Sequence, residues 1–153
     1  MGRVPENLCP KGSQRWMQWY VNHAPHVFDE HIGLGQIDWR SPLRDDSYAE
    51  YLDGAFLERL GITLSQRPLA AFWPRGGPRW DALGRARSGE YVIVEAKAHL
   101  DELYSPDSDA CDASLAIIPA SLADAARAMN VPEASIGRNS FINMPIASRT
   151  RIS

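Results

Sequence analysis

Residues 91–99 read YVIVEAKAH, a run of four β-forming residues that ends in an acid and a base. The β-branched and aromatic residues at its start suit a buried strand. Because side chains alternate along a strand, Glu95 and Lys97 point to one face, whereas Val92 and Val94 point to the other. The pattern therefore predicts a strand with one face that packs and one face that carries chemistry.

A second strand is predicted just upstream, and the two are joined by a short turn. Residues 87–89 read Arg-Ser-Gly, which suits a type I turn followed by a residue with positive φ, where glycine costs least. This turn sets Ala86 opposite Glu90, and counting back along both strands sets Asp81 opposite Glu95. Directly opposed residues share one face, with Cβ atoms about 4.5–5.5 Å apart. A slip of one residue would separate the two carboxylates, so the prediction depends on this register.

Two carboxylates and an ammonium around one point suit the hydrolysis of a phosphodiester bond. Carboxylates this close repel each other unless a cation or a proton lies between them. Magnesium prefers oxygen ligands and is held by one or two carboxylates together with substrate phosphate oxygens, so Asp81 and Glu95 are the predicted ligands. Lys97 is expected to orient or deprotonate the attacking water, or to neutralise charge on the phosphate. A role as general base would require a depressed pKa for Lys97.

This pattern resembles the PD-(D/E)xK nuclease superfamily, which has the restriction endonuclease-like fold. In its motif an acid at the end of one strand precedes an acid-x-Lys triplet on the next, and Asp81, Glu95 and Lys97 match these positions. The resemblance implies an α/β domain with a mixed sheet and flanking helices, a Mg²⁺ or Mn²⁺ cofactor, and DNA as the substrate. It also implies that the backbone carbonyl of Ala96 faces the metal. Trp80 stands where the family has its proline, which takes no part in the chemistry.

The resemblance extends beyond the motif. Residues 72–99 are similar to a group of uncharacterised bacterial proteins that are longer than this chain, and the likeness runs from the N-terminus to near Ala125. The superfamily core is a helix, a three-stranded meander, a helix and a further strand. We expect this chain either to be just long enough to form all of these elements or to end before the last of them. Residues 121–129 suit the second helix, residues 106–119 suit a loop, and residues 140–146 suit a late strand.

A helix is predicted over residues 45–60, with Asp45 or Asp46 as its N-cap. Within it, leucines and a phenylalanine recur at intervals of four and form one apolar stripe. Glu58 lies at the edge of this stripe, and Glu50 lies closer to solvent. Glu58 is therefore the candidate for the catalytic glutamate that the family often carries on this helix. A solvated helix charge is an equally good interpretation of Glu58.

Length and composition predict one globular domain. The chain has 153 residues, of which 44% are hydrophobic and 23% are charged. We expect a helical accessory segment over residues 1–42, a nuclease-like core over 43–146 and a tail over 147–153. In the accessory segment, Trp16, Trp19 and Tyr20 are expected to pack one aromatic face into the core. No stretch approaches the roughly 18 apolar residues of a membrane span and no signal pattern begins the chain, so we expect a cytoplasmic protein with no membrane partner.

The charge distribution around the hairpin favours a nucleic-acid partner. A net charge of −3 counts against a general binder of nucleic acid, because lysine and arginine dominate phosphate binding. On the approach to the hairpin and into its first strand and turn, however, five arginines with only Asp81 as an acid among them lie together with two tryptophans. This arrangement suits the binding of a phosphate backbone and the stacking of a base. Ordinary surface arginines and core tryptophans are the other interpretation. The arginines are Arg67, Arg75, Arg79, Arg85 and Arg87, of which Arg75, Arg79 and Arg85 are assigned to substrate binding.

The sequence leaves three functions open. The preferred one is a magnesium-dependent nuclease that acts on DNA. The second is a truncated or degenerate member of the same fold that keeps the site but serves as a non-catalytic binding module. The third is a small structural protein in which Glu95 and Lys97 form an incidental surface ion pair, an interaction that stabilises a fold only weakly.

Overall fold

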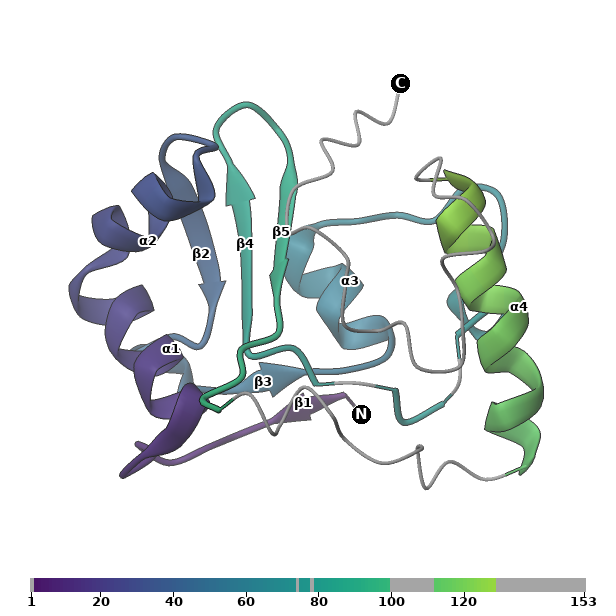
Figure 1. Ribbon diagram of the computed structural model, residues 1–153, viewed down its shortest axis with the longest axis horizontal. Coiled ribbons are helices and arrows are strands. Elements are labelled where there is room, and N and C mark those ends of the chain that lie inside the picture. Colours follow the sequence, from purple (N-terminus) through teal and green to yellow (C-terminus); the bar gives the residue numbers. More distant parts are fainter. Residues whose placement is uncertain (1, 74, 78, 100–111, 129–153) are drawn as a thin grey trace. The chain divides into compact units, whose positions relative to one another are not determined.

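The structure is a computed structural model that describes residues 2–73, 75–77, 79–99 and 112–128. The chain divides into two compact units, Met1–Thr63 with Pro78–Ala98 and Leu64–Gly77 with His99–Ser153. Helices and antiparallel sheets make up the described part, as the predicted α/β class requires (Figure 1). Across the described residues, no helix is long and apolar enough to cross a membrane.

The central sheet of the first unit contains the predicted hairpin. Its strands are β2 (Ile37–Ser41), β4 (Ala82–Ala86) and β5 (Tyr91–Val94), in the order β2-β4-β5. The sequence predicts a mixed sheet, but all strand pairs within the described ranges are antiparallel. The structure also differs from the predicted boundary at residue 42, because β2, from the expected accessory segment, pairs with β4.

The register of the hairpin is confirmed. Arg85 stands opposite Tyr91, and the pairing continues without a shift to the last pair of the ladder. At the turn, the N–H of Ala86 donates to the carbonyl of Glu90 at 2.9 Å, and the N–H of Gly89 donates back to the carbonyl of Ala86 at 2.9 Å. Gly89 has a φ of +106°, a conformation that residues with a Cβ rarely adopt. The turn chemistry therefore sets the register, as the sequence predicts.

One face of this sheet is covered by two helices, α1 (Gly12–His23) and α2 (Pro25–Ile32) (Figure 1). The indole of Trp39 lies across β4 at Gly84, where an added Cβ would come 2.6 Å from Ile37 Cγ2 and 3.1 Å from the Trp39 ring. Trp39 Nε1 donates to Asp29 Oδ1 on α2 at 3.0 Å, which ties this helix to the sheet. The buried core residues are Met17, Val21, Ile37, Trp39, Ala82, Ala86 and Val92.

The expected aromatic face of the first helix is wrong for its two tryptophans. Trp16 and Trp19 are exposed, because α1 turns Met17 and Val21 toward the sheet and positions 16 and 19 lie on another side of the helix. Tyr20, the third aromatic residue of the predicted face, does pack against the core.

Strand β5 has one packed face and one open face, as the sequence predicts. Val92 packs in the core, whereas Tyr91 and Ile93 point to the other face and are exposed.

A second, two-stranded sheet lies beside the first, formed by β1 (Arg3–Val4) and β3 (Glu50–Tyr51). It leads into α3 (Gly54–Leu60), which packs against β4 on the other side of the central sheet from α1 and α2 (Figure 1). A single antiparallel bridge between Tyr51 and Trp80 joins β3 to the segment that enters β4. This bridge brings residues from the middle of the chain to the end of the hairpin.

The predicted helix over residues 45–60 is therefore wrong over residues 45–53. Only a 3₁₀ turn at Arg44–Asp46 and the short helix α3 form, and Gly61 ends α3 with a φ of +71°. Between them, Ser47, Tyr48 and Asp53 all have positive φ, which a helix does not allow. The strand pairs of β3 with its two neighbours replace the helical hydrogen bonds, so tertiary pairing outweighs local propensity here.

The second unit contains a 3₁₀ turn at Leu69–Ala71 and helix α4 (Asp112–Ala128). The predicted helix is confirmed over residues 121–128, but residues 112–119, expected as a loop, are also helical, with Pro119 inside the helix. The helix therefore begins nine residues before Ser121, the first residue of the predicted helix. The Ser121 hydroxyl donates to the carbonyl of Phe72, and Asp124 pairs with Arg67, so α4 is held by residues near the 3₁₀ turn. The predicted strand at 140–146 and tail at 147–153 lie outside the described residues.

Candidate functional site

The candidate site lies where the β4–β5 ladder ends. Asp81 immediately precedes β4, and the triplet of Glu95, Ala96 and Lys97 immediately follows β5. Continuing the observed register by one step sets Asp81 opposite Glu95, as the sequence predicts. Beyond the last strand pair, a side chain replaces the backbone carbonyl as the hydrogen-bond acceptor. The N–H of Ala96 donates to Asp81 Oδ2 at 2.6 Å. This bond fixes the acid against the strand that carries the triplet.

The triplet presents its two charged side chains on one face. Lys97 Nζ lies 2.5 Å from Glu95 Oε1, and their side chains are 35% and 43% exposed. Ala96, between them, packs against the core on the other face, beside Val94. The predicted alternation is therefore confirmed, and the acid and the base are open to solvent.

A third carboxylate, which the sequence interpretation placed near solvent on a helix, lies beside Asp81. The bridge between Tyr51 and Trp80, continued by one residue, sets Glu50 opposite Asp81. Glu50 is only 7% exposed, and its Oε1 accepts a hydrogen bond from Gln14 Nε2 on α1 at 2.5 Å. The expectation that Glu50 faces solvent is wrong, because it belongs to a strand and not to a helix.

The electrostatic environment of Glu50 favours its neutral form. Burial raises the pKa of Glu50, and the negative charges of Asp81 and Glu6 raise it further. The hydrogen bond from Gln14 and the charge of Arg79 act in the opposite direction but do not outweigh them. Glu50 is therefore a buried acid that is short of positive partners, the condition in which a carboxylate takes up a proton or a cation.

Glu50, Asp81 and Glu95 thus occupy successive positions across three neighbouring chain segments. Their oxygens are the donor type that a hard divalent cation prefers. In the part of the chain that the structure describes, no three acid, histidine or cysteine side chains approach closely enough to hold a metal ion. The arrangement offers two adjacent carboxylate pairs that share Asp81, rather than a convergent cluster of three acids.

The arginines assigned to substrate binding lie in different places. Arg79 is near the site, with its Nη1 3.7 Å from Glu6 Oε1. Arg85 lies over the ring of Tyr91, 5.3 Å from its centroid, and both are exposed on the hairpin. Arg75 belongs to the second unit.

Glu58 lies in a separate pocket. This pocket has a volume of about 430 Å³, and Glu58 lines it from α3 together with Arg3, Tyr51 and Arg59. None of the motif residues Asp81, Glu95 and Lys97 lines it. The role of Glu58 as the helical glutamate stays a prediction, and Glu50 is the acid that the structure brings to Asp81.

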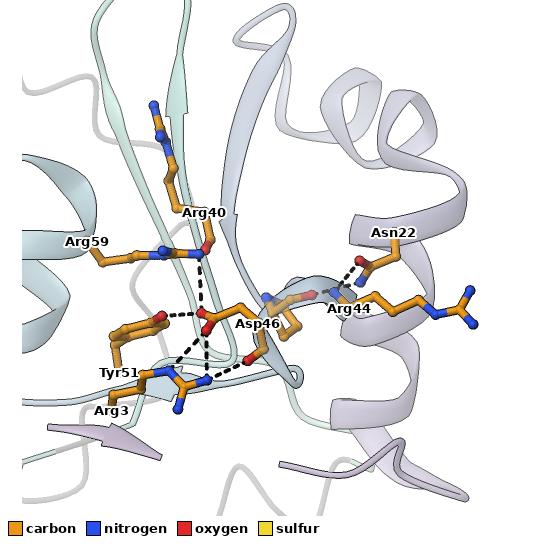
Figure 2. Close-up of polar contacts among 8 residues, drawn as sticks. Arg3, Asn22, Arg40, Arg44, Asp46, Tyr51 and Arg59 are labelled. Carbon is orange, nitrogen blue, oxygen red and sulfur yellow. Dashed lines mark hydrogen bonds and ion pairs between the residues drawn. The ribbon is translucent and has the colours of Figure 1, made fainter. Parts of the chain in front are cut away.

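Next to this pocket, Asp46 is the centre of a polar network (Figure 2). Its Oδ1 accepts hydrogen bonds from Arg3 at 2.7 and 3.0 Å, and its Oδ2 accepts one from the Tyr51 hydroxyl and lies 3.2 Å from Arg59 Nη2. Burial alone would raise the pKa of Asp46, but the bonds from Tyr51 and Arg3 and the charges of both arginines outweigh it and lower the pKa. The network ties β1, β3 and α3 to the 3₁₀ turn.

One local signal for the true position of Glu50 was present in the sequence. Asp53-Gly54 is a turn dipeptide in the middle of the predicted helix, and it separates the residues around Glu50 from α3. The turn preference of this dipeptide indicates that the predicted helix is interrupted there. The pairing of Glu50 with Asp81 had no sequence signal, because the two residues are 31 positions apart and meet only through the bridge at Trp80.

No family model, curated protein or solved structure matches this chain.

Proposed function

We propose that this chain is a magnesium-dependent nuclease that hydrolyses phosphodiester bonds in DNA and has a restriction endonuclease-like fold. The observation that carries the proposal is the end of the hairpin, where Asp81 accepts the N–H of Ala96 and Lys97 pairs with Glu95. Continuing the ladder by one step sets Asp81 opposite Glu95. An acid, a second acid and an ammonium at one strand end are the groups that metal-assisted phosphodiester hydrolysis needs.

The donor set fits the proposed metal. Asp81, Glu95 and the backbone carbonyl of Ala96 would supply oxygen ligands to Mg²⁺ or Mn²⁺, and waters and substrate oxygens would complete the shell. Bound there, the ion would polarise the phosphoryl oxygen and lower the pKa of a bound water. The buried acid Glu50 next to Asp81 supports this proposal, because the repulsion between the two carboxylates is relieved when a cation binds.

Lys97 has a distinct role in the proposal. Its ammonium is 2.5 Å from Glu95 Oε1, so a phosphate that reaches the ligand carboxylate also comes within reach of Lys97. There the positive charge would stabilise the negative charge that builds up on the phosphate oxygens, or orient the attacking water. Arg79, near the hairpin end, would contact a neighbouring phosphate, and Arg85, which lies toward the turn of the hairpin, would contact one farther along the backbone.

A non-catalytic binding module is the second candidate. It is favoured by the ion pair between Lys97 and Glu95, which already neutralises one proposed ligand. It is also favoured because, among the described residues, no three acid, histidine or cysteine side chains are grouped so that they could hold a metal ion. Such a module would bind a divalent ion or a phosphate without cleaving it. The two candidates differ in one measurable property, the turnover of substrate.

The decisive experiment combines cleavage and metal binding. Plasmid and single-stranded DNA are incubated with Mg²⁺ or Mn²⁺ and the wild-type chain, Asp81→Asn or Lys97→Ala, and thermal unfolding is followed with and without metal. Asp81→Asn keeps an acceptor for the N–H of Ala96 and removes only the charge. Asp38→Asn, an exposed acid on β2 outside the site, is the matched control.

For a nuclease, both site variants lose cleavage by at least about a hundredfold, an effect typical of losing a charged catalytic group. Lys97→Ala keeps the metal-dependent thermal shift and Asp81→Asn loses it, whereas Asp38→Asn behaves as wild type. A thermal shift without cleavage in the wild type would establish the binding module instead. Neither cleavage nor a shift would mean that the ion pair is incidental.

A further inference from the structure

The exposed side of α1 carries a second feature that the hairpin chemistry does not use. A surface pocket of about 480 Å³ lies there, lined by six residues. Trp16 and Trp19 form its aromatic part and are 56% and 40% exposed. The lining consists of Pro10, Lys11, Gly12, Arg15, Trp16 and Trp19.

The two indoles are supported from within the helix. Their spacing of three residues puts them side by side on α1. Trp16 contacts the ring of Tyr20 with 6.1 Å between centroids, and Trp19 meets the same ring edge-on at 5.2 Å. Trp19 also contacts His23 at 6.2 Å. These contacts hold the indoles in place while leaving a large part of each exposed, an arrangement that suits the stacking of a flat ligand.

The pocket is positively charged at its edge. Lys11 and Arg15 line it, and no acid does. Within the described part of the chain neither side chain forms an ion pair. Two cations beside two exposed indoles complement a ligand that combines flat aromatic rings with negative charges. Nucleotides combine a flat ring and a negative charge in every unit. Neutral sugars lack the charge, and a peptide has both only where an aromatic residue lies beside an acidic one.

The exposed indoles also distinguish single-stranded from double-stranded nucleic acid. In a duplex the faces of the bases are stacked on one another and closed to a protein side chain, so only unpaired bases can stack on Trp16 or Trp19. We infer that the α1 pocket binds a short segment of single-stranded nucleic acid, with bases on the two tryptophans and phosphates at Lys11 and Arg15.

The pocket shares its helix with the candidate site. Gln14, one position before Arg15, donates to Glu50, which stands opposite Asp81. One side of α1 thus contacts the acids at the hairpin end and another carries the pocket. The inference does not depend on the proposed cleavage, because stacking and phosphate binding need neither a metal nor a reaction.

Binding is tested with the full chain in EDTA, so that cleavage is absent. Labelled oligothymidylate is titrated with the protein while anisotropy and tryptophan quenching are recorded, and a duplex of equal length is titrated in parallel. We expect the single strand to bind more tightly than the duplex. Stacking on an aromatic side chain is worth about 1–3 kcal/mol per base, so Trp16→Ala and Trp19→Ala should each weaken binding about tenfold or more. The corresponding Trp→Phe variants should recover part of the affinity.

The role of the two positively charged side chains is tested by the salt dependence of binding. Arg15→Ala should weaken binding several-fold and reduce the slope of log affinity against log salt by about 1, the effect of one lost phosphate contact. Arg44→Ala removes the same charge from an exposed position outside the pocket, and Leu64→Ala removes an exposed apolar side chain; both should bind as wild type. Circular dichroism checks that each variant keeps its helices.

Three results would overturn the inference. They are the absence of oligothymidylate binding by the wild type, binding that survives both Trp→Ala substitutions, and equal affinity for single strand and duplex. A shift of tryptophan emission with anionic phospholipid vesicles, without quenching by oligothymidylate, would assign the pocket to a membrane surface instead. The binding assay contains no divalent ion. Its result therefore does not depend on whether the chain is a nuclease.

Discussion

Asp46 and Glu50 are two carboxylates four residues apart that lie in opposite electrostatic environments. Asp46 accepts hydrogen bonds from Arg3 and Tyr51 and contacts Arg59, and its pKa is lowered (Figure 2). Glu50 accepts one hydrogen bond from a neutral amide, lies in register with another acid, and has a raised pKa. The same functional group is therefore satisfied in one place and left short of positive charge in the other.

The difference shows what each carboxylate contributes to the fold. A carboxylate with three strong donors holds its surroundings together and has little capacity left for a ligand. A buried carboxylate beside a second acid lowers the stability of the fold while it is charged, and a proton or a cation relieves this destabilisation. Asp46 therefore stabilises the fold, whereas Glu50 is the acid that a proton or a cation would stabilise.

The largest effect is expected when Asp46 loses its carboxylate. Asp46→Ala removes the acceptor of Arg3, Tyr51 and Arg59 and should lower the free energy of unfolding by about 2 kcal/mol, the order expected for several charge-assisted hydrogen bonds at a half-buried site. Urea unfolding measures the change. Asp45→Ala, its exposed neighbour with no such network, is the control and should change stability little. Equal effects of the two variants would show that the network does not hold β1 and β3.

A smaller change of opposite sign is expected at Glu50. Glu50→Gln keeps an acceptor for Gln14 and removes the buried charge, so at neutral pH without metal it should raise the melting temperature by a few degrees. The same substitution should reduce any stabilisation by Mg²⁺, because the negative charge of Glu50, which would attract the cation, is lost. Glu58→Gln, an exposed acid in the neighbouring pocket, serves as the comparison. A melting temperature that falls in Glu50→Gln would contradict the assignment of Glu50 as an unsatisfied charge.

The smallest effect is the pH dependence that distinguishes the two acids. The pKa of Asp46 is lowered from its ordinary value of 3.8, so its stabilisation is present above that pH and is lost as the pH falls through the folded pKa. The pKa of Glu50 is raised from 4.5, so its cost is absent below that pH and grows as the pH rises through the folded pKa.

Thermal unfolding of Asp46→Asn and Glu50→Gln from acid to neutral pH tests both signs. Relative to wild type, the destabilisation in Asp46→Asn should shrink as the solution becomes acidic, and the stabilisation in Glu50→Gln should also vanish there. Differences that stay constant over the whole range would mean that neither carboxyl titrates differently in the folded and unfolded chain.

The parts of the fold that the sequence predicted are those governed by neighbours along the chain. The turn at Gly89, the alternation of Val92 and Glu95, and the register down to Asp81 all follow from residues within one hairpin, and the structure has each of them. The helix over residues 45–60 failed because pairing partners from elsewhere decide that segment. Strand β3 pairs with Arg3 and Val4 near the N-terminus and with Trp80 at the entry to the hairpin.

The sequence by itself determined the hairpin, the face on which Glu95 and Lys97 stand, and the end of α3 at Gly61, because turn chemistry, side-chain alternation and helix capping act over a few residues. Only the tertiary structure decided that Glu50 is buried opposite Asp81, that Asp46 is neutralised by Arg3 and Arg59, and that the tryptophans of α1 stay outside the core. These features depend on which distant segments pair and on which side of a helix meets the sheet. Local propensity does not depend on either choice, so the burial of Glu50 beside a second acid could be found only in the fold.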